Sequence, residues 1–170
     1  MSMPKVLSSD DGEIEYRKRI VPSADIFVPE HVLSEMTDHA QEGLEADSEI
    51  MGLIIGKVYT DDRGKYAVAD RISTSALIAD RVGVRFDKER IEEMFSSLVF
   101  KEGERVIGWY HSHLDIGCFM SPIDVKTQNG LFSGECGFAI VIDPVRQELR
   151  VFDSTPDNPQ PADMIIMEAD

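Results

Sequence analysis

The sequence predicts a domain of the α/β or α+β class, in which helices pack on a β-sheet. Segments with apolar residues at helical spacing alternate along the chain with short, continuously apolar runs. The chain has 170 residues, of which 42% are hydrophobic, enough for one buried core. No internal repeat interrupts the alternation, so we expect one central domain.

The first half of the predicted domain contains one helix and a pair of strands. The run EIMGLIIGKVY, from Glu49, is too continuously apolar for a strand with a solvated face, so we expect it at the centre of the sheet. YAVADRIST pairs with it through the turn DDRG. Before this pair, after Pro29, the apolar residues at helical spacing are Val32, Leu33, Met36, Ala40 and Leu44.

The second half repeats the pattern of helix and strand. Asp87 is predicted to cap a second helix. ERVIGWYHSH is the next strand, a short helix begins at Ser121, and GFAIVIDPVRQELRVFD forms two strands around a turn that contains proline. The apolar face of the second helix comprises Ile91, Met94, Phe95, Leu98 and Val99.

Both ends are predicted to lie outside the central domain, which spans residues 23–153. Residues 1–22 fit either an edge strand or a loose extension. Residues 154–170 begin with STPDNPQPA, whose three prolines oppose regular structure. They end in the acidic MEAD, which we expect to be frayed.

Charge and composition exclude several classes of function. The chain has 17 basic and 32 acidic residues and a net charge of −15, which disfavours binding to nucleic acid. Neither a membrane-spanning apolar run nor the apolar block of a signal peptide is present, so we expect a cytoplasmic location. The two cysteines, Cys118 and Cys136, are too few for a disulfide framework, and Cys118 is predicted to be a buried packing residue.

Two histidines one residue apart, His111 and His113, are the first indication of chemistry. On a strand their side chains point to the same face, with Cα atoms about 6.5–7 Å apart, so they could share a metal ion. A catalytic zinc commonly takes three protein ligands and one water, and Asp124 is the candidate third ligand. On its own, a His-x-His pair on a strand is more often a surface or core pair, and that alternative stays open.

The residues around Asp124 have a second interpretation. Ser-Pro-Ile-Asp fits the start of a helix, with Ser121 as the N-cap and Asp124 in a shortened capping box. Capping and metal binding are compatible, because a carboxylate in the first helical turn is already held rigid. Glu49, at the entry of the apolar strand, could shuttle the proton of a metal-bound water. Alternatively, it is an exposed charge at a strand end.

This combination resembles the JAMM (MPN+) signature of zinc-dependent isopeptidases. The signature comprises Glu49, then His111-Ser-His113, seven residues, Ser121, two residues and Asp124. SEIMGLIIGK, VIGWYHSH and GCFMSPIDVKTQ are similar to the family's segments, and the likeness extends over residues 24–153. Within the family, the chain most resembles the deubiquitinating subunit of the proteasome lid and its archaeal homologues.

The resemblance implies an α/β fold of the JAMM/MPN type, similar to cytidine deaminases, with a curved mixed sheet and flanking helices. It implies that His111, His113 and Asp124 bind one zinc ion. Glu49 would be the general base, and Ser121 would donate a hydrogen bond to the oxyanion. The implied reaction is hydrolysis of the bond between the C-terminal glycine of ubiquitin, or a ubiquitin-like modifier, and a substrate lysine. The implied partners are such conjugates and proteasome-related machinery.

Residues 73–86 correspond to a family region that can form a substrate-binding hairpin. An extended modifier tail could add to its edge as a strand. The alternative is an ordinary strand that leads into the second helix. The candidate substrate-binding residues are Val82, Gly83, Val84, Arg85 and Phe86.

One departure from the family and two other functions complete the expectations. Leu114 stands where the family usually has proline, so the backbone after the second histidine is less constrained. The alternatives to an isopeptidase are a non-catalytic MPN scaffold and a zinc hydrolase of small amides. The zinc deaminase signature, His-x-Glu with Pro-Cys-x-x-Cys, is absent from the sequence.

Overall fold

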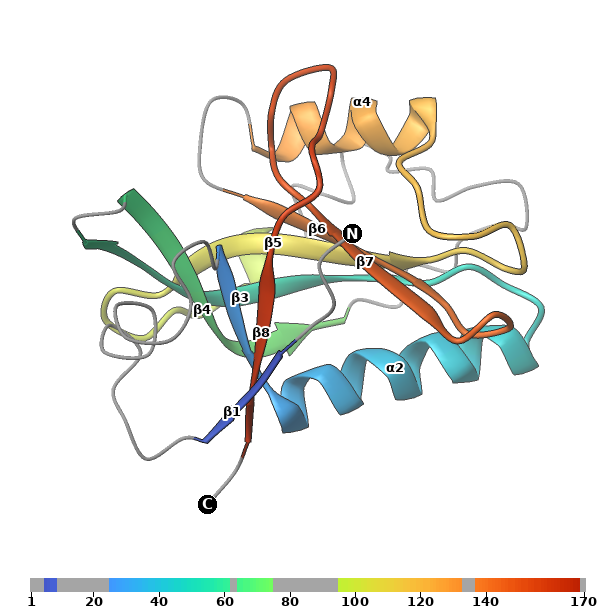
Figure 1. Cartoon of the computed structure of the whole chain (residues 1–170), viewed down its shortest axis with the longest axis horizontal. Helices are drawn as coiled ribbons and strands as arrows, with labels where there is room; N and C mark the ends of the chain where they lie inside the picture. The colour runs from blue at the N-terminus through green and yellow to red at the C-terminus, as the bar shows by residue number, and fades with distance from the viewer. Residues whose placement is uncertain (1–4, 9–24, 62–63, 75–94, 133–136, 169–170) are drawn as a thin grey trace.

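The computed structural model describes residues 5–8, 25–61, 64–74, 95–132 and 137–168. Within these residues, eight strands form one mixed sheet in the order β1-β8-β2-β4-β3-β5-β6-β7 (Figure 1). The strands are β1 (Lys5–Ser8), β2 (Ile26–Pro29), β3 (Met51–Asp61), β4 (Gly64–Ser73), β5 (Arg105–Ser112), β6 (Phe138–Asp143), β7 (Glu148–Phe152) and β8 (Met164–Glu168). The helices α2 (Glu30–Glu45) and α4 (Pro122–Leu131) flank the sheet.

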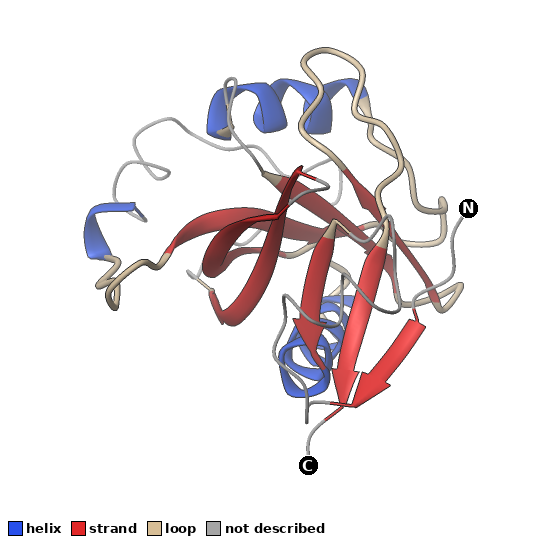
Figure 2. Ribbon diagram, turned by 60° about the vertical axis from the view of Figure 1, so that its left-hand side comes forward, coloured by secondary structure: helices blue, strands red, loops and turns tan. Residues whose placement is uncertain are grey.

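The sheet is curved, and α2 and α4 lie on its opposite faces (Figures 1 and 2). Alternate residues of each central strand therefore enter different layers of the core. On β6, Ile140 and Ile142 belong to the cluster that packs against α2, whereas Ala139 and Val141 belong to the cluster on the side of α4. Coverage of both faces explains why the central strands are apolar throughout.

Strand β3 lies inside the sheet, as predicted, and pairs antiparallel with both β4 and β5. The β3–β4 hairpin is closed by the pair of Asp61 and Gly64 at the predicted turn. Strand β5 pairs in parallel with β6, and α4 lies between them in the chain, because parallel neighbours need a crossover connection. The first turn of α4 therefore lies beside the C-terminal end of β5.

The prediction for the second helix is only partly testable. Its expected cap, Asp87, and the residues as far as 94 lie outside the described residues. Residues 95–97 are helical, but Val99 is 83% exposed, so its predicted place on a buried helical face is wrong. The chain leaves the helix at Leu98, and Arg71 donates a hydrogen bond from Nη2 to the Val99 carbonyl at 2.7 Å.

The expectation that the acidic end MEAD is frayed is wrong for Met167 and Glu168, which belong to strand β8. Strand β8 pairs in parallel with both β1 and β2, and Met164 and Ile165 are buried. The proline-containing segment before it is irregular, as predicted, apart from a single bridge between Phe152 and Pro161. Burial of Met164 and Ile165 favours the strand although acidic residues flank it. Strand β1 lies at an edge of the sheet, while residues 1–4 and 9–22 lie outside the described residues, so the two options for residues 1–22 stay a prediction there.

Candidate metal centre

The end of β5 brings the two histidines to one site. His111 pairs with Met51 of β3 and Val141 of β6, and His113 follows directly after the strand. Both side chains are buried, and their ring centroids are 5.1 Å apart. The predicted placement on a common face is confirmed.

Asp124 reaches the same site from the first turn of α4. Its Oδ2 atom lies 3.1 Å from Nε2 of His111 and 3.1 Å from Nε2 of His113. The same carboxylate accepts the backbone N–H of Ser121 at 2.9 Å, while Ser121 Oγ accepts the N–H of Asp124 at 3.1 Å. The capping box is therefore present, and it aims the Asp124 carboxylate at the histidines. One position of the Asp124 carboxylate is thus compatible with both interpretations of this residue, capping and metal binding.

The arrangement fits a metal ion. One donor atom from each of His111, His113 and Asp124 lies within 4.8 Å of the others. His111 is fully buried, and in the described part of the chain neither of its ring nitrogens makes a contact with hydrogen-bond geometry, although Nε2 lies 3.1 Å from Asp124 Oδ2. A buried polar atom without a partner is unfavourable, and a metal bound to the imidazole would satisfy one of these nitrogens. Two imidazoles and a carboxylate are a donor set that suits zinc.

The charges of the site also suit a cation. Burial lowers the pKa of His111, although Asp124 acts in the opposite direction, so this imidazole is neutral at pH 7, as a metal ligand must be. Burial opposes charge on His113, but Asp124 and the Gly117 carbonyl together raise its pKa. Burial also favours a neutral Asp124, but the contacts with both histidines outweigh it and hold the pKa well below the usual range. Asp124 is therefore an anion between the two rings.

Glu49 is brought beside the cluster by the pairing of β3 with β5. The N–H of Ile50 donates to Ser112 Oγ at 2.8 Å, and the N–H of Ser112 donates to the Ile50 carbonyl at 3.0 Å. Continued beyond Met51 and His111, this antiparallel register places Glu49 opposite His113, whose charge acts on the Glu49 carboxyl. Glu49 is only 8% exposed, so the alternative of an exposed strand-end charge is wrong.

The surroundings of Glu49 prepare its carboxyl for proton transfer. Burial raises its pKa to about 7, with Asp124 acting in the same direction and His113 in the opposite one. A group with a pKa near the working pH both accepts and releases protons readily. The neighbouring candidate, Ser121, accepts one hydrogen bond in the cap, and its hydroxyl retains a proton to donate.

Two residues support the histidines in ways that the sequence pattern did not reveal. The Trp109 ring stacks on His111 with centroids 4.3 Å apart, so this core aromatic also forms a wall of the site. Trp109 Nε1 donates to Oε1 of Gln128, a buried residue of α4. The contact between Trp109 and His111 could have been expected, because residues two apart on a strand point to the same face. The only signal for the contact with Gln128 is a polar residue on the buried face of the helix.

The remaining sequence-predicted residues have different outcomes. Cys118 is buried in the cluster on the side of α4, as predicted, and burial raises the pKa of its thiol to about 11. Phe119, to which the sequence analysis gave no role, lies against His113, with ring centroids 4.9 Å apart. The candidate substrate-binding residues Val82, Gly83, Val84, Arg85 and Phe86 lie outside the described residues.

Fold and site together define an α/β domain with a candidate metal centre where a strand end meets a helix start. Residues 22–132, more than half of the chain, match the family model described as JAB1/Mov34/MPN/PAD-1 ubiquitin protease. The chain belongs to this family, as the sequence signature indicated.

The chain is similar to subunits of two large complexes. It is 34% identical to COP9 signalosome complex subunit 5 from Caenorhabditis elegans, over 93% of this chain and 43% of the relative. It is 28% identical to ubiquitin carboxyl-terminal hydrolase RPN11 from Saccharomyces cerevisiae, over 86% of this chain and 45% of the relative. The chain thus spans less than half the length of these relatives.

Solved structures share the fold at low sequence identity. A solution structure of a protein from Desulfitobacterium hafniense matches with a TM-score of 0.54 and 18% identity, over 85% of this chain and 94% of that one. A JAB1/MPN domain protein from Archaeoglobus fulgidus matches with a TM-score of 0.50 and 14% identity, over 81% and 97%. The expected fold, a curved mixed sheet with flanking helices, is confirmed. No helix among the described residues has the length and apolar character to cross a membrane.

Proposed function

We propose that this chain is a zinc-dependent isopeptidase that hydrolyses the bond between the C-terminal glycine of ubiquitin, or a ubiquitin-like modifier, and a substrate lysine. The observation that supports this most strongly is the convergence of four side chains. His111, His113 and Asp124 form a cluster with the spacing of a metal site, and Glu49 is buried beside it with a pKa of about 7.

Each side chain has a role that follows from its position. Zinc held by His111, His113 and Asp124 would acidify a water molecule and polarise the substrate carbonyl. Glu49 would accept a proton from that water as its oxygen bonds to the carbonyl carbon. When the carbon–nitrogen bond breaks, Glu49 would return the proton to the departing lysine amine. Ser121 would donate a hydrogen bond to the carbonyl oxygen as negative charge develops on it.

We also propose that the natural substrates are protein conjugates of such a modifier, encountered in machinery related to the proteasome or the signalosome. Support comes from the two relatives, one a signalosome subunit and the other a ubiquitin hydrolase, together with the family description. The net charge of −15 favours a basic surface on the partner.

The test is cleavage of a panel of isopeptide-linked ubiquitin and ubiquitin-like conjugates, with and without a zinc chelator. We expect cleavage that the chelator abolishes and added zinc restores. Glu49→Gln should retain about one zinc per chain but lose cleavage, because the three ligands remain and proton transfer is lost. Glu45→Gln, at the exposed end of α2, is the matched control and should cleave normally.

Other results would favour the alternatives. Zinc binding with turnover of small amides and none of protein conjugates would indicate a small-molecule hydrolase. Absence of both zinc binding and cleavage would indicate a scaffold. Normal cleavage by Glu49→Gln would contradict the role assigned to that residue.

A further inference from the structure

The orientation of His113 depends on a loop outside the ligand set. Its Nδ1 atom donates a hydrogen bond to the Gly117 carbonyl at 2.8 Å, because a carbonyl oxygen can only accept. This bond places the other ring nitrogen, Nε2, toward Asp124 at 3.1 Å. A histidine that binds metal through one nitrogen commonly has the other held by such an acceptor. The position of Gly117 therefore sets the direction of the imidazole.

The loop that carries Gly117 is not held by its own sequence. Leu114 lacks the fixed backbone angle that a proline would provide. Asp115 and Gly117 have φ angles of 62° and 86°, in the left-handed region, which is unfavourable for the aspartate. Contacts with another part of the chain must therefore stabilise the loop.

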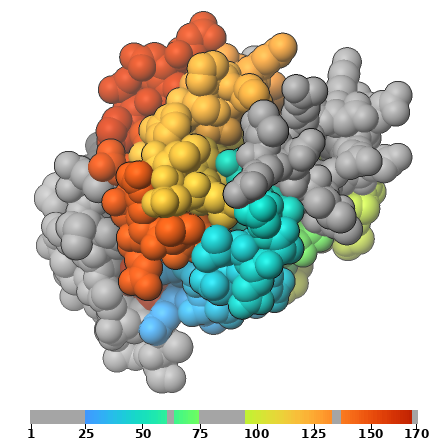
Figure 3. All heavy atoms as spheres, turned by 90° about the vertical axis from the view of Figure 1, so that its right-hand side faces the viewer, coloured from blue at the N-terminus to red at the C-terminus, as the bar shows by residue number. Residues whose placement is uncertain are grey.

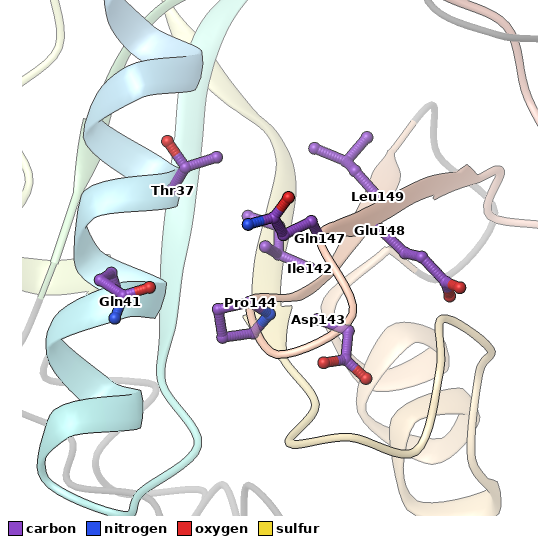
Figure 4. Close-up of a pocket in the computed structure, with 8 residues that line it drawn as sticks. All are labelled: Thr37, Gln41, Ile142, Asp143, Pro144, Gln147, Glu148 and Leu149. Carbon is purple, nitrogen blue, oxygen red and sulfur yellow. The ribbon is translucent and has the colours of Figure 1, made fainter.

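Asp143, the last residue of β6, supplies these contacts. Its carboxylate is fully buried and accepts the backbone N–H of Gly117 at 2.8 Å and that of Asp115 at 3.1 Å. It also accepts the N–H groups of Val145 and Arg146, both at 3.1 Å, in the turn that follows β6. One buried anion thus ties the loop after His113 to the β6–β7 turn. Figure 4 shows Asp143 among the residues that line a cavity of about 280 Å³, together with Thr37 and Gln41 of α2, and its carboxylate is directed away from these two residues.

Arg146 also links the β6–β7 turn to the loop after His113, through contacts at the protein surface. Its Nε atom donates to Asp115 Oδ1 at 3.1 Å, and its Nη2 atom donates to the Asp115 carbonyl at 3.1 Å. Loop and turn lie side by side on the surface, gold against orange (Figure 3). Both side chains are largely exposed, so this contact is weaker than the buried one.

On the basis of the metal centre proposed above, we propose that Asp143 is a positioning residue for metal binding. It fixes the loop after His113, the Gly117 carbonyl in turn fixes the imidazole, and Nε2 is thereby held ready for the ion. Arg146 reinforces the loop through Asp115. Asp143 does not touch the ion or the substrate, so its effect appears first in metal affinity and geometry, and only through these in turnover.

The test is zinc affinity of purified Asp143→Asn, measured by competition with a chromophoric chelator. Asparagine keeps the size of the side chain but presents an N–H₂ group where two sets of N–H donors converge. We expect zinc affinity to fall by about tenfold or more, as for other residues that support a metal-binding histidine. We also expect the visible absorption of the cobalt-substituted protein to shift, because the coordination geometry is altered.

The matched control is Asp153→Asn. Asp153 likewise accepts backbone N–H groups through its side chain, those of Thr155 and Gln160, and the substitution keeps its backbone carbonyl, which accepts Gln128 Nε2. Its zinc affinity and cobalt spectrum should equal those of the wild type. Equal losses of zinc affinity in Asp143→Asn and Asp153→Asn would show that Asp143 has only a general structural role, which would overturn the inference.

The remaining outcomes also decide the question. Unchanged zinc affinity and cobalt spectrum in folded Asp143→Asn would overturn the inference while leaving the proposed function intact. If Asp143→Asn does not fold, Arg146→Ala decides instead: a severalfold loss of zinc affinity supports the inference, and wild-type affinity overturns it. Failure of the wild-type protein to bind zinc would overturn the metal centre itself and the inference with it.

Discussion

The Asp124 carboxylate approaches His113 through the same oxygen atom, Oδ2, that accepts the Ser121 N–H of the helix cap. The start of α4 and the candidate metal site therefore share an atom. Two substitutions can distinguish the two roles of this region. A change at Ser121 weakens the helix cap, whereas a change at Asp124 weakens the cluster with the histidines.

Ser121→Ala and Asp124→Asn should have opposite profiles. Loss of the Ser121 hydroxyl removes an N-cap and should lower the free energy of unfolding by about 1 kcal/mol, while zinc remains bound. Asp124→Asn keeps an oxygen for the Ser121 N–H but loses the anionic ligand, so zinc binding should be lost. Denaturant unfolding and zinc content measure the two effects. Loss of zinc in Ser121→Ala, or its full retention in Asp124→Asn, would contradict this assignment.

The raised pKa of Glu49 predicts a pH dependence of stability in the metal-free protein. Its pKa rises from 4.5 to about 7 on folding, so the folded state binds the proton more tightly than the unfolded state. Between these values the contribution of Glu49 to the free energy of unfolding therefore falls as pH rises. Glu49→Gln, which cannot ionise, should be more stable than the wild type at pH 8 and about equally stable at pH 4. Thermal unfolding at both pH values measures this, and an equal difference at both would refute it.

The bond between Trp109 and Gln128 predicts a non-additive pair. Gln128→Leu removes the acceptor of a buried indole N–H, which typically costs about 1–3 kcal/mol. Trp109→Phe removes the donor and keeps an aromatic ring against His111. In the double variant the second substitution should lower the free energy of unfolding by less than it does alone, because neither the indole N–H nor the amide oxygen is left without its partner. Urea unfolding of the four proteins measures the coupling, and strictly additive losses would show that the bond contributes nothing.

Strand β8 predicts that the C-terminal segment contributes to stability. Ile165 is 1% exposed, so Ile165→Ala should lower the free energy of unfolding by about 2–4 kcal/mol. Asn158→Ala, in the exposed loop before the strand, is the control and should change it by less than about 0.5 kcal/mol. Similar small effects in both would mean that residues 164–168 do not pack on the sheet in solution.

Local sequence patterns were sufficient to predict the helices and strands whose residues are buried uniformly or at a regular spacing. The helix after Pro29 and the hairpin through DDRG were predicted because a single apolar face or a turn sequence specifies each of them. The same reasoning failed at Val99, where the chain leaves the helix although the apolar spacing continues. It also failed at β8, whose five residues become a strand only because β1 and β2 lie on either side.

For this protein, the sequence by itself determined the candidate ligands and the cap, because a period of two on a strand and a Ser-Pro-x-Asp start are local properties. Only the tertiary structure decided that Glu49 is buried opposite His113, since their separation in the chain is bridged by the pairing of β3 with β5. The same holds for Asp143 and Gly117, which meet because β6 lies beside β5. Contacts between distant segments depend on strand order and register, and no local spacing specifies either.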